Sequence, residues 1–185
     1  TVGDDYEAST QFIAKYMLSN LGTGKKFSDE SGEMVTEDIA KAKSLLAEAG
    51  YPNGAGFPTV TYNYPNNEQD KLIAQAIQAQ LKSALNINVE LNGMESQVCV
   101  SERKSGNFDM TRHNWTADYD DAMDYLLMWT STSGLNDAGI KDADYDKLCE
   151  DATAELDETK RNTIMHDAEK LLVTDKAYVA PLATN

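Results

Sequence analysis

Residues 59–91, TVTYNYPNNEQDKLIAQAIQAQLKSALNINVEL, decide the fold class of this chain. Residues 59–64 are β-branched and aromatic, as in a strand, and residues 87–91 alternate apolar with polar side chains, as in a second strand. Between them, Asn66 or Asn67 opens a long helix whose apolar residues recur at helical spacing. Strand, helix and strand in this order form a βαβ unit, so we expect parallel strands joined by a right-handed crossover.

A helix is also expected before this unit. Thr36 is the expected N-cap, and Gly50 followed by Pro52 ends the helix. Residues 1–35 begin with an expected helix over residues 6–21 and continue as a stretch of Gly, Ser and charged residues with little to bury. We therefore expect residues 1–35 to be an N-terminal helical segment and linker, and residues 36–185 to form an α/β lobe. The apolar face of the helix after Thr36 consists of Ile39, Ala42, Leu45, Leu46 and Ala49.

The segment after the second strand holds the candidate functional residues. Following a helix over residues 95–105, residues 108–113 alternate as a strand, and Asp120 or Asp121 caps a further helix. The turn between strand and helix, residues 115–119 (WTADY), follows the carboxyl end of a strand, where open α/β sheets usually bind ligands. Asp118 is the first candidate, because it precedes the cap and lies between aromatic residues.

A carboxylate in such a half-buried aromatic turn needs a cationic partner, because desolvating a lone charge is costly. The ammonium group of a ligand is one candidate partner for Asp118, and Arg112 in the preceding strand is the other. Trp115 and Tyr119 are placed to pack against a ligand. The simpler interpretation of the remaining carboxylates of this segment is capping and solvent exposure at the helix start; they are Asp120, Asp121 and Asp124.

Two helices and a strand are expected in the C-terminal part. Asp142 caps the first helix, the second covers residues 158–173, and residues 177–182 are typical of an edge strand. His166, on the second helix, is expected to be exposed. Cys99 and Cys149 either form a disulfide or remain as two buried thiols.

Composition and motifs exclude several functions. The net charge of −15 argues against nucleic acid, which is bound through clustered Lys and Arg. No signal peptide begins the chain, so a signal of an exported protein would lie outside it. We expect no metal site and no cofactor, because EF-hand, paired Cys/His, GxSxG and P-loop patterns are absent. A carboxylate-dependent hydrolase, with two acidic side chains across one cleft, remains an alternative.

Residues 42–64, AKSLLAEAGYPNGAGFPTVTYNY, closely resemble the segment that introduces the second lobe of peptide-binding proteins of ABC importers, the extracytoplasmic solute-binding family 5. The resemblance continues through SERKSGNFDM, NWTADYDDAMDYL and SGLNDAGIKDADYDKL, and spans about residues 36–182. It implies an α/β lobe like that of type II periplasmic binding proteins, a small and mostly parallel sheet with helices packed on it. The N-terminal lobe of the much longer family members is missing.

The resemblance implies a non-catalytic receptor outside the cytoplasm, in the periplasm or lipid-anchored at the outer face of the cell membrane. Such a receptor captures peptides between two lobes and delivers them to the permease subunits of an ABC importer. With one lobe missing, we expect this chain alone to bind peptides weakly or not at all.

The resemblance also assigns site residues. It implies that Asp118 pairs with the amino terminus of the peptide, that Trp115 lies beside the site and that Arg112 lies close to the cleft. Thr116 and Tyr119 complete the predicted ligand-binding set. The chain departs from the family pattern at Ser96, Ala122 and Ile140, so the ligand stays open, and an oligosaccharide or a metal chelate is the alternative solute.

Overall fold

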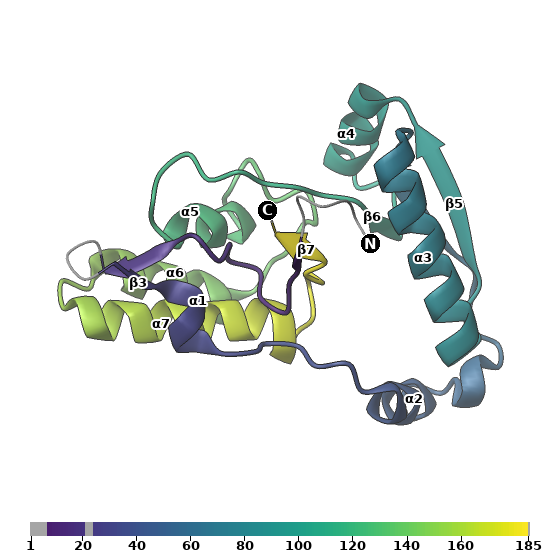
Figure 1. Cartoon of the computed structure of the whole chain (residues 1–185), viewed down its shortest axis with the longest axis horizontal. Helices are drawn as coiled ribbons and strands as arrows, with labels where there is room; N and C mark the ends of the chain where they lie inside the picture. The colour runs from purple at the N-terminus through teal and green to yellow at the C-terminus, as the bar shows by residue number, and fades with distance from the viewer. Residues whose placement is uncertain (1–6, 21–23, 185) are drawn as a thin grey trace. The chain divides into compact units, whose positions relative to one another are not determined.

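The computed structural model describes residues 7–20 and 24–184 of the chain. In this part, residues 37–114 form one compact unit, and the residues up to Thr36 together with residues 115–184 form the other. We call them the sheet unit and the helical unit and describe each by itself (Figure 1). The chain thus passes from one unit to the other after Thr36 and again after Asn114.

The sheet unit contains a three-stranded parallel sheet with β4 in the centre, β5 on one side and β6 on the other. Helix α3 connects β4 to β5 and packs against both strands. Figure 1 shows α3 alongside β5. Asn67 caps α3 by accepting a hydrogen bond from the Asp70 N–H. The predicted βαβ unit is therefore confirmed. The elements of the sheet unit are α2 (Ile39–Glu48), η1 (Pro52–Gly54), β4 (Val60–Pro65), α3 (Glu68–Leu85), β5 (Val89–Met94), α4 (Ser96–Lys104) and β6 (Met110–Thr111).

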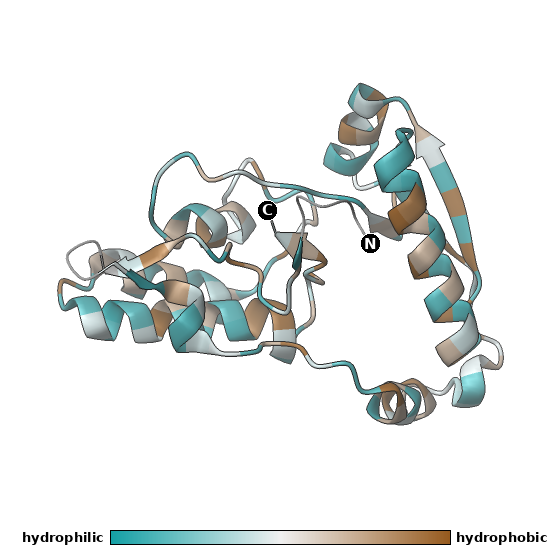
Figure 2. Ribbon diagram, in the orientation of Figure 1, coloured by the Kyte–Doolittle hydropathy of each residue, from teal (hydrophilic) through white to brown (hydrophobic). Residues whose placement is uncertain are grey.

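The core of the sheet unit lies between the sheet and its helices. Hydrophobic and hydrophilic residues alternate along β5, as expected for a strand with one packed face (Figure 2). Helix α2 is present, but its N-cap is Asp38 and not Thr36, because Asp38 Oδ1 accepts the Lys41 N–H at 2.8 Å. None of the α2 side chains is buried. The buried residues of this core are Tyr62, Tyr64, Ala74, Ile87 and Val89.

The helical unit has a separate core, formed by Ile13, Ala14, Met17 and Phe27 from the start of the chain and mainly by helices from its C-terminal part. The predicted helices over the C-terminal part are confirmed, and Asp142 caps α6 as expected. The described elements are β1 (Glu7–Ala8), β2 (Leu18–Asn20), β3 (Lys25–Lys26), α1 (Phe27–Ser31), α5 (Met123–Leu126), η2 (Leu127–Trp129), α6 (Ala143–Ala154), α7 (Glu158–Lys170), the π-helical turn η3 (Leu171–Asp175) and β7 (Ala183–Thr184).

The helix expected over residues 6–21 is wrong. Across the described residues 7–20 the chain instead forms β1 and β2, which pair with β7 and β3. Ile13, Met17 and Phe27 are at most 1% exposed, so this segment contributes to the core and is not a surface linker. Burial of these side chains, together with the pairing of β1 with the distant β7 and of β2 with the nearby β3, outweighs the local helical preference.

The structure settles three further expectations. The strand expected over residues 177–182 is wrong, because the described pairing is confined to β7, after Pro181. His166 is not exposed: its ring stacks on Phe27 with centroids 3.9 Å apart. Cys99 and Cys149 are buried free thiols, so the disulfide alternative is wrong. None of the described helices has the length and apolar character needed to span a bilayer.

Candidate functional site

The predicted site turn, residues 115–119, lies in the helical unit and leads into α5. Thr116, Asp118 and Tyr119 are exposed, whereas Trp115 is partly buried and packs against the core of this unit. Over residues 7–20 and 24–184, the Asp118 carboxylate has no hydrogen-bond or ion-pair partner, although its backbone N–H is bonded. The turn therefore presents one unpaired negative charge beside two aromatic side chains.

Asp124 organises the turn from the interior. Its side chain is 8% exposed, and its Oδ2 accepts the Trp115 indole N–H at 2.7 Å and the Asp118 backbone N–H at 3.2 Å. The solvated helix start expected for Asp124 is wrong. Its neighbours in sequence gave no signal of this role, because the indole N–H that it accepts belongs to Trp115, nine positions earlier in the chain.

The two other carboxylates of this segment have partners inside the helical unit. Asp121 accepts the Met123 N–H at 2.8 Å and forms an ion pair with Arg161 of α7 at 2.9 Å. The N-cap of α5 is Ala122, so the cap expected at Asp120 or Asp121 is wrong. Asp120 accepts the Leu18 N–H of β2 at 3.1 Å. Within the described ranges, no group of three or more His, Cys, Asp or Glu side chains is arranged to hold a metal ion.

Arg112 lies in the sheet unit, directly after β6. Its Nε donates to Asp70 Oδ1 at 3.2 Å, and its Nη1 donates to the His113 carbonyl. Arg112 therefore has its carboxylate partner within its own unit. Of the five predicted site residues, four share the turn of the helical unit, and Asp124 connects two of these, Trp115 and Asp118.

Electrostatics keep the aromatic part of the turn neutral. The pKa of Tyr119 is raised mainly by partial burial and, to a smaller extent, by the nearby carboxylates of Asp124 and Asp121. The phenol therefore stays protonated at neutral pH and is available both to donate and to accept a hydrogen bond. This chemistry suits a ligand with an ammonium group and neighbouring amide groups.

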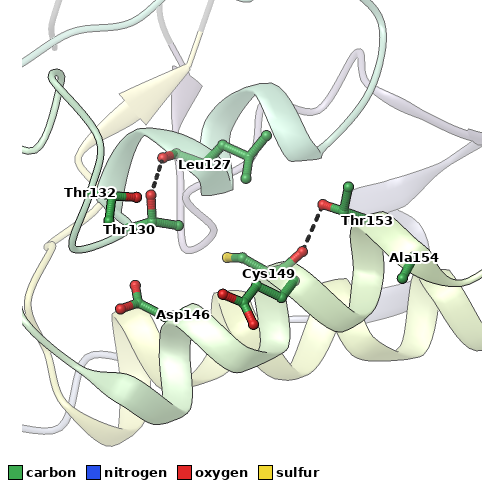
Figure 3. A pocket seen from close by; sticks show the side chains of 8 residues that line it. Leu127, Thr130, Thr132, Asp146, Cys149, Thr153 and Ala154 are labelled. Carbon is green, nitrogen blue, oxygen red and sulfur yellow. Dashed lines mark hydrogen bonds between the residues drawn. The ribbon is translucent and has the colours of Figure 1, made fainter.

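A cavity of about 340 Å³ lies elsewhere in the helical unit, between η2 and α6 (Figure 3). It contains none of the five predicted site residues. Burial raises the pKa of Cys149 to about 11, so its thiol is neutral and a poor nucleophile. Nothing about this thiol therefore points to covalent chemistry in the cavity. Its lining residues are Leu127, Thr130, Thr132, Asp146, Cys149, Glu150, Thr153 and Ala154.

A family model and several known proteins that are similar to this chain indicate the same family. The family model described as bacterial extracellular solute-binding proteins, family 5 Middle, matches residues 2–137. The dipeptide-binding protein DppE of Bacillus subtilis (strain 168) is 33% identical over 158 residues, which are 84% of this chain and 29% of that protein. The periplasmic murein peptide-binding protein MppA of Escherichia coli (strain K12) is 34% identical over 152 residues, 81% of this chain and 28% of that protein.

Another relative carries a different ligand in its name. The probable deoxycholate-binding periplasmic protein YgiS of Escherichia coli (strain K12) is 33% identical over 156 residues, 83% of this chain and 28% of that protein. This chain therefore spans less than a third of the length of these three relatives.

Solved structures agree on the fold. A peptide-binding protein of a peptide ABC transporter superposes with a TM-score of 0.86 at 25% identity, covering 99% of this chain and 82% of that one. The substrate-binding domain of an oligopeptide ABC transporter from Bacillus anthracis str. Ames superposes with a TM-score of 0.90 at 22% identity, covering 98% and 36%. The predicted fold class, like that of type II periplasmic binding proteins with a small parallel sheet, is confirmed.

Proposed function

Because this chain belongs to the bacterial extracellular solute-binding proteins of family 5, we propose that it is part of the peptide-capturing receptor of an ABC importer. The receptor acts outside the cytoplasm, in the periplasm or lipid-anchored at the outer face of the cell membrane, and delivers peptides to permease subunits. Residues 36–185 contribute to one lobe, and the N-terminal lobe of the longer protein supplies the opposite side of the cleft. The receptor binds its ligand without catalysis.

The Asp118 carboxylate carries this proposal. It is exposed, and it lacks a counter-charge among the residues that the structure describes. A peptide ammonium group would supply that charge through a hydrogen bond between two ionised groups, which is stronger than a bond between neutral groups. Thr116 and the aromatic side chains of Trp115 and Tyr119 would contact the first residues of the peptide. Arg112 belongs to the proposed set through the family resemblance alone, because Asp70 already neutralises it.

The test compares a peptide that has a free amino terminus with its N-acetylated form, using isothermal titration of the complete receptor. We expect Asp118→Asn to weaken binding of the free peptide by about 10- to 100-fold and to remove its advantage over the acetylated form. Asp144→Asn is the matched control, because it removes the same charge from an exposed position on α6 of the helical unit. Equal affinities of wild type and Asp118→Asn for the free peptide would refute the proposal.

A second candidate is a receptor for another small solute, which the relative named for deoxycholate favours. Mass spectrometry of the solute that copurifies with the complete receptor distinguishes the candidates: a peptide supports the first, and a sterol, oligosaccharide or metal chelate supports the second. A carboxylate-dependent hydrolase would need a second acidic side chain facing the same cleft as Asp118. The carboxylate of Asp124 accepts the Asp118 backbone N–H but is buried, so we do not propose a hydrolase.

A further inference from the structure

Asp124 is a buried carboxylate whose hydrogen-bond partners are neutral groups. Its side chain is 8% exposed, and no described Lys, Arg or His forms an ion pair with it. One oxygen, Oδ2, accepts both the indole N–H of Trp115 at 2.7 Å and the backbone N–H of Asp118 at 3.2 Å. Removing a carboxylate from water is costly, so burial here requires that both donors stay in place.

Both donors belong to the site turn. Hydrogen bonds to an ionised acceptor are shorter and roughly twice as strong as neutral ones, and the Trp115 bond has the length expected for this class. This bond fixes the rotation of the Trp115 ring. The second bond fixes the backbone from which the Asp118 side chain projects. Because the same oxygen receives both, the ring and the backbone are held in one mutual geometry.

The two carboxylates therefore differ in role. Asp118 is exposed and has no partner among the described residues, whereas Asp124 is buried and bonded. We propose that Asp124 is the positioning residue of the site, which holds Trp115 and the Asp118 carboxylate in the geometry that receives the ammonium group of the ligand. This inference rests on the proposed function. Asp124 acts through Trp115 and Asp118 and not by touching the ligand.

The test follows the indole N–H resonance of Trp115 in ¹⁵N–¹H NMR spectra of the complete receptor, with Trp129 as an internal reference. We expect Asp124→Ala to move this resonance upfield, because the indole loses its carboxylate acceptor. Asp124→Asn should keep the resonance close to its wild-type position, since its amide oxygen accepts the same bonds. Peptide affinity should fall about 10-fold or more in Asp124→Ala and stay within about threefold of wild type in Asp124→Asn.

The nearby Asp121 provides the control. Asp121→Asn alters a carboxylate bonded to Met123 and Arg161, so it should leave the Trp115 resonance in place. If Asp124→Ala does not fold, Asp124→Leu removes the acceptor while keeping the side-chain volume, and the same shift is expected.

Two outcomes overturn the inference. One is an unchanged Trp115 resonance in Asp124→Ala or Asp124→Leu. The other is a shifted resonance with unchanged peptide affinity, while Asp118→Asn weakens binding. The proposed function fails in a different way: the resonance shifts as expected, but neither the Asp118 nor the Asp124 variants change peptide affinity. That result overturns the ligand role of both residues and retains only the contact between Asp124 and Trp115.

Discussion

Glu169 is a carboxyl group that the helical unit buries completely. Its Oε1 accepts the backbone N–H groups of Phe12 and Ile13 at 2.9 and 3.0 Å, and its Oε2 has no partner among the described residues. Burial raises its pKa to about 6, and the two backbone hydrogen bonds oppose this shift. Glu169 thereby connects α7 to the segment before Thr36, which we had expected to be a linker.

A raised folded-state pKa means that the folded protein binds the Glu169 proton more tightly than the unfolded chain does. Its stabilising contribution is present below the unfolded pKa of 4.5 and is lost as the pH rises through about 6. In urea unfolding, we expect the stability of wild type relative to Glu169→Gln to fall by about 2 kcal/mol between pH 4.5 and 7.5. A difference that does not change with pH would contradict this assignment. Glu150→Gln, which removes the same charge from an exposed position of α6, is the matched control.

The candidate site residues were predictable to different degrees. Asp118 was proposed from its place between aromatic residues after a strand; the structure leaves this residue exposed, but β6 ends at Thr111 and belongs to the sheet unit. Asp124 could not be assigned from its neighbours in sequence, because its role depends on a side chain nine positions earlier, Trp115, folding back onto it. Spacing reveals which face of a helix is apolar, but it does not reveal which donor a buried acid meets.

At the scale of elements, the local sequence pattern predicted helices and strands correctly where the contacts that stabilise them are local. The boundaries of α3 follow from the Asn67 cap and from helical spacing, and β4 and β5 pair in parallel across that helix. The short strands β1 and β2 were missed because their partners are distant or irregular. Glu7 pairs with Thr184, and the pairing of β2 with β3 shifts register between Leu18 and Asn20.

The turn between α2 and β4 depends on Gly54. Its φ is +73°, and a Cβ at this position would lie 2.3 Å from the Leu85 carbonyl oxygen at the end of α3. Gly56 has a similar φ of +76°, but a Cβ there meets nothing within 4 Å. Comparing substitutions at Gly54 and Gly56 therefore distinguishes backbone strain, which both would cause, from a steric clash, which only a side chain at Gly54 would cause.

We expect Gly56→Ala to cost about 1 kcal/mol of stability, because its φ is unfavourable for a side chain. Gly54→Ala should cost about 3 kcal/mol or more, because the last turn of α3 must also move. Urea unfolding of both variants measures the two costs. Equal losses would show that the turn relaxes away from Leu85 without penalty.

At the scale of the whole molecule, the described residues form two separate hydrophobic cores, one in each compact unit. The sequence pattern led us to group residues 36–185 together, whereas the helical unit also recruits residues from the start of the chain, among them Ile13 and Phe27. Composition could not reveal this division, because the contacts that the apolar residues before Thr36 make in the core lie far along the chain. Each unit therefore has the apolar interior that a compact fold requires.

The length of the chain leads to a prediction about binding. Solute receptors that close around a ligand derive affinity from contacts made on both sides of the cleft, and this chain spans only 29% of its dipeptide-binding relative. In the proposed site Asp118 is the charged anchor, so the isolated chain would keep this ion pair and lose the contacts from the other lobe. A lone ion pair exposed to water contributes about 1 kcal/mol or less. We expect isothermal titration of the isolated chain to show peptide binding weaker than millimolar, and binding to return when the N-terminal lobe is present. Micromolar binding by the chain alone would show that one lobe holds a complete site.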